Sequence, residues 1–192
     1  MQSAVPVGAG AMAAILGLEY NDVVDVSEDA RRNDVCEVAN DNDPSQVVVS
    51  GHKAAVERAI EIAKKKGAKR AVLLPVSAPF HCKLMAPASD IMATALSEIK
   101  ILPPAVPIVT NVTARPTIDP NEIKGLLVEQ VTGTVKWRES IFFMAKNGVT
   151  KTLEIGAGKA LSGMVRRIDR SISTKSIGGA PDVAGLMAEL NN

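Results

Sequence analysis

The chain has 192 residues, of which 46% are hydrophobic, and its 22 Lys and Arg residues nearly balance its 21 Asp and Glu residues. This length can bury a substantial core, and the composition is that of a globular protein rather than a disordered or fibrous one. Balanced charge and only 3% aromatic residues argue against a nucleic-acid-binding protein, which needs excess cations and stacking rings. Cys36 and Cys82 are too few for a disulfide framework and lack the spacing of metal ligands.

The sequence shows no targeting or membrane-spanning segment. Its longest apolar stretches, such as AMAAILGL at residues 11–18, are far too short to cross a bilayer. The first ten residues have no basic region of the kind that begins a signal peptide. We therefore expect a cytoplasmic globular protein that binds no metal and has neither a membrane nor a nucleic acid as partner.

The first 77 residues predict the order strand, helix, strand, strand, helix, strand. Apolar and β-branched runs indicate the strands, and apolar residues at helical spacing before Gly67 indicate the clearest helix. Asn, Asp and Pro at 40–45 indicate a loop. This order is typical of a split-βαβ, ferredoxin-like unit. The predicted elements are strand 11–18, helix 21–32, strands 35–40 and 46–51, helix 52–67 and strand 69–77.

After His81 helices alternate with strands. Such alternation favours α/β layering with parallel pairing of the strands. The predicted elements are helix 83–100, strand 106–112, helices 121–131 and 137–148, strand 151–156, helix 158–168, strand 171–177 and helix 181–190.

His81 is one of two histidines in the chain and stands between a predicted strand and a predicted helix. Imidazole titrates near neutrality, and a helix N-terminus would keep the ring uncharged, so His81 is a candidate general base or acid. The alternative is a histidine that fills a polar gap near a loop, and chemistry alone favours that alternative. His52, which opens an amphipathic helix, is better explained as a capping or surface residue.

The residues themselves do not name a nucleophile for this base. Cys82 adjoins His81, but neighbouring side chains at the start of a helix diverge. The chain contains no Gly-x-Ser-x-Gly nucleophile elbow. The Gly-rich turn at 154–163, EIGAGKALSG, could suggest a phosphate cradle, but it lacks the spacing and the hydroxyl residue of a P-loop.

Five segments together resemble the malonyl-CoA:acyl-carrier-protein transacylases of bacterial fatty-acid synthesis. The resemblance runs in order through essentially the whole chain, and its most specific parts are the stretch from residue 41 to 52 and the Pro-x-His-Cys junction at 79–82. The segments are GAMAAILGL, NDNDPSQVVVSGHKAAVERA, GAKRAVLLPVSAPFHCKLMAPA, PIVTNVTA and LEIGAGKALSGMVRRI.

The resemblance implies an α/β fold with a complete ferredoxin-like (βαββαβ) small subdomain, residues 8–77, and part of an α/β-hydrolase-like large subdomain, residues 78–192. It implies transfer of malonyl from coenzyme A to the phosphopantetheine thiol of acyl carrier protein, with the coenzyme A thioester as substrate and no cofactor. In such enzymes a serine attacks the thioester. His81 would be its general base, and Gln130 lies in the segment whose backbone carbonyl orients the imidazole.

The resemblance also implies what the sequence lacks. The family's serine elbow, oxyanion-hole segment and malonyl-binding arginine would precede residue 1. We therefore expect a C-terminal portion of a transacylase that is inactive alone and leaves an apolar sheet edge exposed. Phe80 would favour malonyl over branched acyl groups, and Asn40, Asn42 and Gln46 would face the cleft and bind pantetheine.

Two alternatives stay open. One is a catalytically inactive fragment that only binds coenzyme A or acyl carrier protein. The other is the acyltransferase module of a polyketide synthase, whose usual linkers and fused neighbours are missing from this sequence. Basic residues near Lys64 and Arg166 are typical of solvated helix faces, but they could also receive an acidic carrier protein.

Overall fold

The computed structural model describes residues 1–190. They form two compact units, Met1–Ser140 and the residues from Ile141 onward, and helix α5 (Trp137–Lys146) runs across the boundary. Within the described part of the chain, no helix is long and apolar enough to span a membrane. Over the same residues, no group of three or more His, Cys, Asp or Glu side chains could hold a metal ion.

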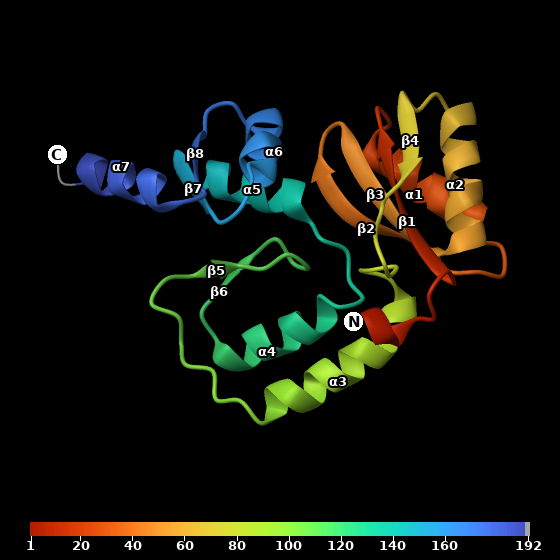
Figure 1. Ribbon diagram of the computed structural model, residues 1–192, viewed down its shortest axis with the longest axis horizontal. Helices are drawn as coiled ribbons and strands as arrows, with labels where there is room; N and C mark the ends of the chain where they lie inside the picture. The colour runs from red at the N-terminus through yellow and green to blue at the C-terminus, as the bar shows by residue number, and fades with distance from the viewer. Residues whose placement is uncertain (191–192) are drawn as a thin grey trace. The chain divides into compact units, whose positions relative to one another are not determined.

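The first unit contains a four-stranded antiparallel sheet with strand order β2-β3-β1-β4, shown with its two helices in Figure 1. The strand order and the chain order are those of the predicted βαββαβ motif. Whether residues 8–77 form a subdomain of their own stays a prediction. The elements are β1 (Gly10–Leu16), α1 (Tyr20–Arg31), β2 (Cys36–Asp43), β3 (Gln46–His52), α2 (Lys53–Lys65) and β4 (Arg70–Leu73).

Strand β1 is apolar along most of its length because both faces of the sheet are covered. Ala13 and Ile15 are fully buried in the cluster that includes the inward faces of α1 and α2. Met12 and Ala14 belong to a second cluster that contains Val48 of β3. Side chains alternate in direction along a strand, so burial on both faces produces an unbroken apolar run.

Helix α2 buries the apolar face that its sequence predicts. Five of its residues are buried. Ile62, on the same helix, is only partly buried. Gly67, with φ of 93°, follows the last turn as a glycine stop does. Lys64 pairs with Glu61 at 2.8 Å, as is typical of a solvated helix face. The buried residues are Ala55, Val56, Ala59, Ile60 and Ala63.

The predicted loop at 40–45 is wrong. Strand β2 continues to Asp43 and only Pro44 and Ser45 separate it from β3. The carboxylate of Asp43 accepts the N–H and the hydroxyl of Ser45 at 2.9 and 2.6 Å, which closes the hairpin. The polar residues are accommodated in the strand by register shifts between Val38 and Asn40 and again before Asp43, as in β-bulges.

The rest of the first unit is less regular than its sequence predicts. The predicted helix 83–100 is divided into a 3-10 turn and a shorter helix, and the predicted strand 106–112 is reduced to two residues. Within the predicted strand, Pro107 lacks the N–H that a strand needs. The elements are η1 (Gln2–Ala4), η2 (Lys83–Met85), α3 (Ala86–Ser97), the antiparallel pair β5 (Ile108–Val109) and β6 (Pro116–Thr117), and α4 (Pro120–Glu129).

The second unit contains the predicted parallel pair of strands. Strand β7 (Lys151–Ile155) pairs with β8 (Ser173–Ile177), and α6 (Ala160–Ile168) connects them as the crossover that parallel strands require. Helix α7 (Ala180–Leu190) follows.

Gly51 has no room for a side chain. A Cβ there would lie 2.0 Å from the carbonyl oxygen of Val35, and the N–H of His52 donates to that oxygen at 2.9 Å. We expect Gly51→Ala to lower the free energy of unfolding by about 1–3 kcal/mol, the usual cost of overpacking, as measured by urea denaturation.

Gly125→Ala is the matched control. Gly125 lies within α4, where a Cβ would meet nothing within 4 Å, so this change should raise stability by about 1 kcal/mol. A Gly51 variant as stable as the parent would contradict the close approach of β3 to Val35.

Candidate active site

The backbone of His81 has a conformation that few residues adopt. Its φ is 58°, in the left-handed region, where a side chain is strained and surrounding contacts must hold it. The expected helix N-terminus is not adjacent, because α3 begins only at Ala86 and the 3-10 turn η2 intervenes. Contacts with other segments therefore position this imidazole.

The imidazole is held by Gln130, the C-cap residue that follows α4. Nδ1 lies 2.9 Å from the Gln130 backbone oxygen and 3.3 Å from its side-chain amide nitrogen. A carbonyl oxygen only accepts, so the shorter contact requires a hydrogen on Nδ1 and leaves a lone pair on Nε2. The amide could donate to Nδ1 only in the opposite tautomer. The closer carbonyl therefore favours an imidazole with a basic Nε2, the form that a general base needs.

A cavity of about 390 Å³ opens beside His81, within the size range of ligand pockets. Three serine and threonine hydroxyls in its wall donate to backbone carbonyls, Ser27 to Val24 at 2.8 Å, Thr134 to Val38 at 2.7 Å and Thr132 to Glu129 at 3.5 Å. Charges of both signs lie in its wall. The lining residues are Tyr20, Val24, Ser27, Glu28, Arg31, Glu37, Val38, His81, Lys83, Thr132, Gly133 and Thr134.

Cys82 is not available as the nucleophile. Its side chain is fully buried, and its Sγ donates to the carbonyl of Pro79 at 3.2 Å. Burial raises the pKa of the Cys82 thiol, whereas the reactive form is the thiolate. These three observations argue against Cys82 as the nucleophile that His81 would activate.

Residues 1–187 match the family of acyl transferase domains. The chain belongs to this family. Malonyl CoA-acyl carrier protein transacylase of Escherichia coli (strain K12) is 44% identical over 177 residues, which cover 92% of this chain and 57% of that protein.

Solved structures of similar proteins share the α/β fold of this acyl transferase chain. The acyl-carrier-protein-S-malonyltransferase from Bartonella henselae is 47% identical, with a TM-score of 0.94, over 100% of this chain and 61% of that one. A malonyl-transacylase in complex with a type II polyketide synthase acyl-carrier protein is 38% identical, with a TM-score of 0.94 and the same two coverages, 100% and 61%. The chain thus spans about three fifths of the length of these relatives.

The three polar residues predicted to bind pantetheine lie on the β2–β3 hairpin. The Asn42 amide donates to the side-chain oxygen of Gln46 at 3.1 Å, so these two side chains lie together. Asn40 forms a bridge with Val135. The described residues that line the cavity beside His81 include none of the three, and their role in this family member stays a prediction.

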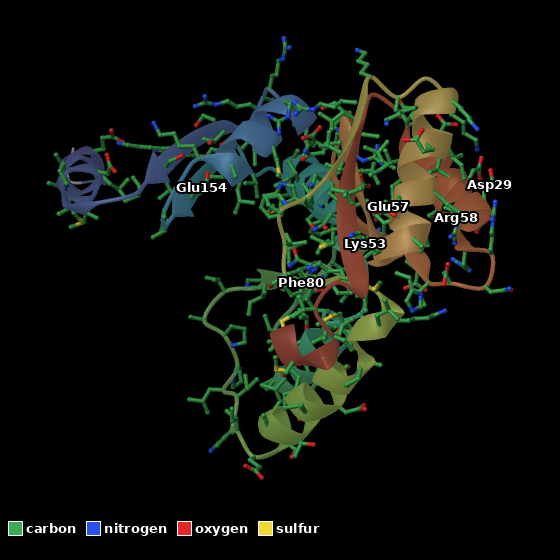
Figure 2. The ribbon with its side chains drawn as sticks, turned by 45° about the vertical axis from the view of Figure 1, so that its right-hand side comes forward. Asp29, Lys53, Glu57, Arg58, Phe80 and Glu154 are labelled. Atoms are coloured by element: carbon green, nitrogen blue, oxygen red, sulfur yellow. The ribbon has the colours of Figure 1, made fainter. Side chains whose placement is uncertain are left out.

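Phe80 is partly buried and packs beside the second face of the sheet. It contacts the cluster of Met12 and Ala14 as well as the cluster of Ala78 and Met85, and Figure 2 places it between the end of the sheet and the helices below. This packing anchors the residue that immediately precedes the imidazole. Selection of malonyl by Phe80 stays a prediction.

Sequence reasoning missed an ion pair close to Gln130 along the chain. Asp41 of β2 is 1% exposed, and Nε of Arg138 lies 2.9 and 3.0 Å from its two carboxylate oxygens. Burial raises the pKa of Asp41, while Arg138 acts to lower it. The guanidinium also lies 5.8 Å from the ring centre of Tyr20. The partners are 97 residues apart, so no local sequence pattern predicts the pair.

The Gly-rich turn before α6 does not form a phosphate cradle. The carboxylate of Glu154, labelled in Figure 2, accepts the N–H groups of Leu161 and Ser162 at 3.1 and 2.7 Å. Hydrogen bonding by Ser162 lowers the pKa of Glu154. The helix N–H groups that would bind an anion are therefore used within the protein. Gly158 has φ of 94°, which explains the need for glycine there.

We expect the two histidines to be opposite neutral tautomers. His52 Nδ1 accepts the N–H of Val35 at 2.9 Å, so its hydrogen is on Nε2, whereas His81 carries its hydrogen on Nδ1. A long-range ¹H–¹⁵N spectrum recorded in mildly alkaline solution distinguishes them. Gln130→Ala should leave the His81 tautomer unchanged, since the acceptor is a backbone oxygen. Matching tautomers, or reversal at His81 in this variant, would contradict the assignment.

We expect neither cysteine to react in the folded chain. Cys36 and Cys82 are both 0% exposed, and burial raises the pKa of Cys36 to about 12. At a pH of about 8, near the ordinary thiol pKa, iodoacetamide should leave both unmodified while it alkylates both in the urea-unfolded chain. Mass spectrometry of tryptic peptides gives the result. Rapid alkylation of Cys82 in the folded protein would restore it as a candidate nucleophile.

Proposed function

We propose that this chain is part of an enzyme that transfers a malonyl group from coenzyme A to the phosphopantetheine thiol of acyl carrier protein in fatty-acid synthesis. The observation that carries the proposal is an imidazole whose Nδ1 contacts the Gln130 carbonyl at 2.9 Å, in a chain of the acyl transferase family. The names of the relatives indicate the acyl group and the carrier.

His81 is the general base in both halves of this reaction. Its Nε2 takes the proton of a serine hydroxyl as the oxygen attacks the malonyl thioester, and the proton then goes to the departing coenzyme A thiol. In the second half it deprotonates the phosphopantetheine thiol, which attacks the malonyl-serine ester, and the proton returns to the serine. The Gln130 carbonyl keeps the imidazole in one orientation and accepts from Nδ1 throughout.

In this proposal the serine, the oxyanion hole and the arginine for the malonyl carboxylate come from residues outside these 192, ahead of residue 1, as the family resemblance implies. Two observations support a nucleophile outside these residues. The hydroxyls of Ser27 and Thr134 donate to backbone carbonyls, and Cys82 is buried. The exposure of Ile155 on β7, 79%, also supports the proposal, because parallel strands are normally covered on both faces. The 192-residue chain alone is then inactive.

The subdomain division expected from the family fits this function. Residues 8–77 form the ferredoxin-like small subdomain, and residues 78–192 form part of the α/β-hydrolase-like large one. The strand order β2-β3-β1-β4 and the parallel pairing of β7 with β8 support the two assignments.

We expect His81→Ala to lower kcat for malonyl transfer by about 10²–10⁴-fold, the usual contribution of a general base. The measurement uses the full-length protein that includes the serine. His52→Ala is the matched control and should keep the parental kcat, because His52 bonds the N–H of Val35. Near-parental transfer by His81→Ala would refute the role of His81.

Intact mass after incubation with malonyl-CoA separates the two parts of the proposal. The 192-residue chain should keep its mass, whereas the full-length protein should gain one malonyl group. An adduct on the 192-residue chain would show that the nucleophile lies within it. Absence of an adduct on the full-length protein would overturn malonyl transfer through a covalent enzyme intermediate.

A further inference from the structure

We infer that the edge strand β2 positions His81 and Gln130 against each other, and that Arg138 is a positioning residue for this pair. The inference rests on the proposed function, in which the Gln130 carbonyl orients the imidazole. The two residues are 49 positions apart and neither belongs to β2. Each is nevertheless connected to β2 through its own set of bonds.

On the His81 side the connection is Glu37 of β2. Its carboxylate accepts the backbone N–H of Lys83 at 2.9 Å and lies 3.4 Å from the Lys83 ammonium. Lys83 follows shortly after His81, whose left-handed backbone must be held by contacts around it. Glu37 thus holds the chain on one side of His81, while the ring itself is bound at Nδ1.

On the Gln130 side the chain that follows α4 lies along the open edge of β2. Thr134 donates its hydroxyl to the carbonyl of Val38 at 2.7 Å. The N–H of Val135 donates to Ala39 at 2.8 Å, and its carbonyl accepts from the N–H of Asp41 at 2.9 Å. β2 stands at the edge of the sheet, where backbone groups otherwise lack partners. These bonds add a short parallel segment and fix its register.

The ion pair of Asp41 and Arg138 adds a further contact between β2 and the chain that follows Gln130. Asp41 is almost fully buried, and a buried carboxylate requires a charged partner. Nε of Arg138 contacts both of its oxygens, which restricts the approach of the chain to one geometry. Arg138 therefore fixes the position of Val135 on β2, and through it the position of the Gln130 carbonyl. Arg138 acts on the imidazole only through Gln130.

A second Arg–Asp pair in the same unit provides a matched control. Nη2 of Arg58 lies 2.6 Å from the Asp34 carboxylate, and His52 Nδ1 lies 3.7 Å from the other Asp34 oxygen. Figure 2 shows Arg58 on the helical layer, whereas Phe80, next to His81, packs on the opposite face of the sheet. Each ion pair thus has its own histidine as a reporter.

The experiment records the ¹⁵N signals of both imidazoles in the 192-residue chain, with Arg138→Met or Arg58→Met. Methionine keeps an unbranched stem and removes the guanidinium. With Arg138→Met, the ratio of the Nδ1–H to the Nε2–H form of His81 should fall roughly fivefold, the factor for loss of about one net hydrogen bond, with His52 unchanged. Arg58→Met should change the signals of His52 and leave His81 unchanged.

Arg138→Lys keeps the charge but not the planar fork, and should restore part of the parental ratio. If circular dichroism shows that Arg138→Met is unfolded, Asp41→Asn, which removes the buried carboxylate charge, takes its place with the same expected fall. An unchanged His81 ratio in the folded variant overturns the inference, and so does an equal change with Arg58→Met. A parental His81 that lacks the Nδ1 hydrogen instead overturns the geometry on which the proposed function rests.

Discussion

One hydrogen bond, from an imidazole nitrogen to a backbone carbonyl, determines what this site can do. The Nδ1 of His81 and the oxygen of Gln130 are 2.9 Å apart. A carboxylate in that place would add a negative charge and could be positioned by side-chain rotation. A neutral backbone oxygen fixes the tautomer without a charge, but it can be positioned only by positioning the main chain itself. The surrounding structure meets that requirement.

The concentration of polar contacts on β2 follows from this requirement. An edge strand normally presents unpaired N–H and C=O groups, which invite association with other chains. Here the Ala39 carbonyl and the Asp41 N–H bind Val135, and Glu37 binds the N–H of Lys83. These hydrogen bonds provide partners for the backbone groups of the β2 edge. They also hold the two segments that carry His81 and Gln130. The strained backbone of His81 is the cost of bringing the ring to that point.

Local sequence patterns predict those helices and strands of this fold that depend mainly on interactions between residues close in sequence. The amphipathic face of α2 and the apolar run of β1 follow from side-chain periodicity. The polar stretch at 40–45 has turn propensity, yet its first four residues lie in strand β2. They pair with β3, and Arg138, distant in sequence, provides the opposite charge for Asp41. No propensity contains that information.

Some residues of the candidate site can likewise be predicted from local sequence, and others cannot. His81 can be singled out from its residue type, because imidazole titrates near neutral pH. Gln130 could be named only through the family resemblance, since a backbone carbonyl is present at every residue and leaves no trace in the sequence. Arg138 and Glu37 have no local signal, because each acts on a distant segment.

The position of the Gln130 carbonyl must be precise, and this requirement explains why a buried ion pair lies at the end of β2. Buried ion pairs add little net stability, and apolar residues of similar size often serve as well. Apolar contacts, however, tolerate sliding. A slip of one residue between Val135 and β2 would move the following chain by roughly 3.3 Å, and an N···O contact of 2.9 Å would then be lost. The two-oxygen contact of Arg138 with Asp41 opposes that slip, so its value is positional rather than energetic.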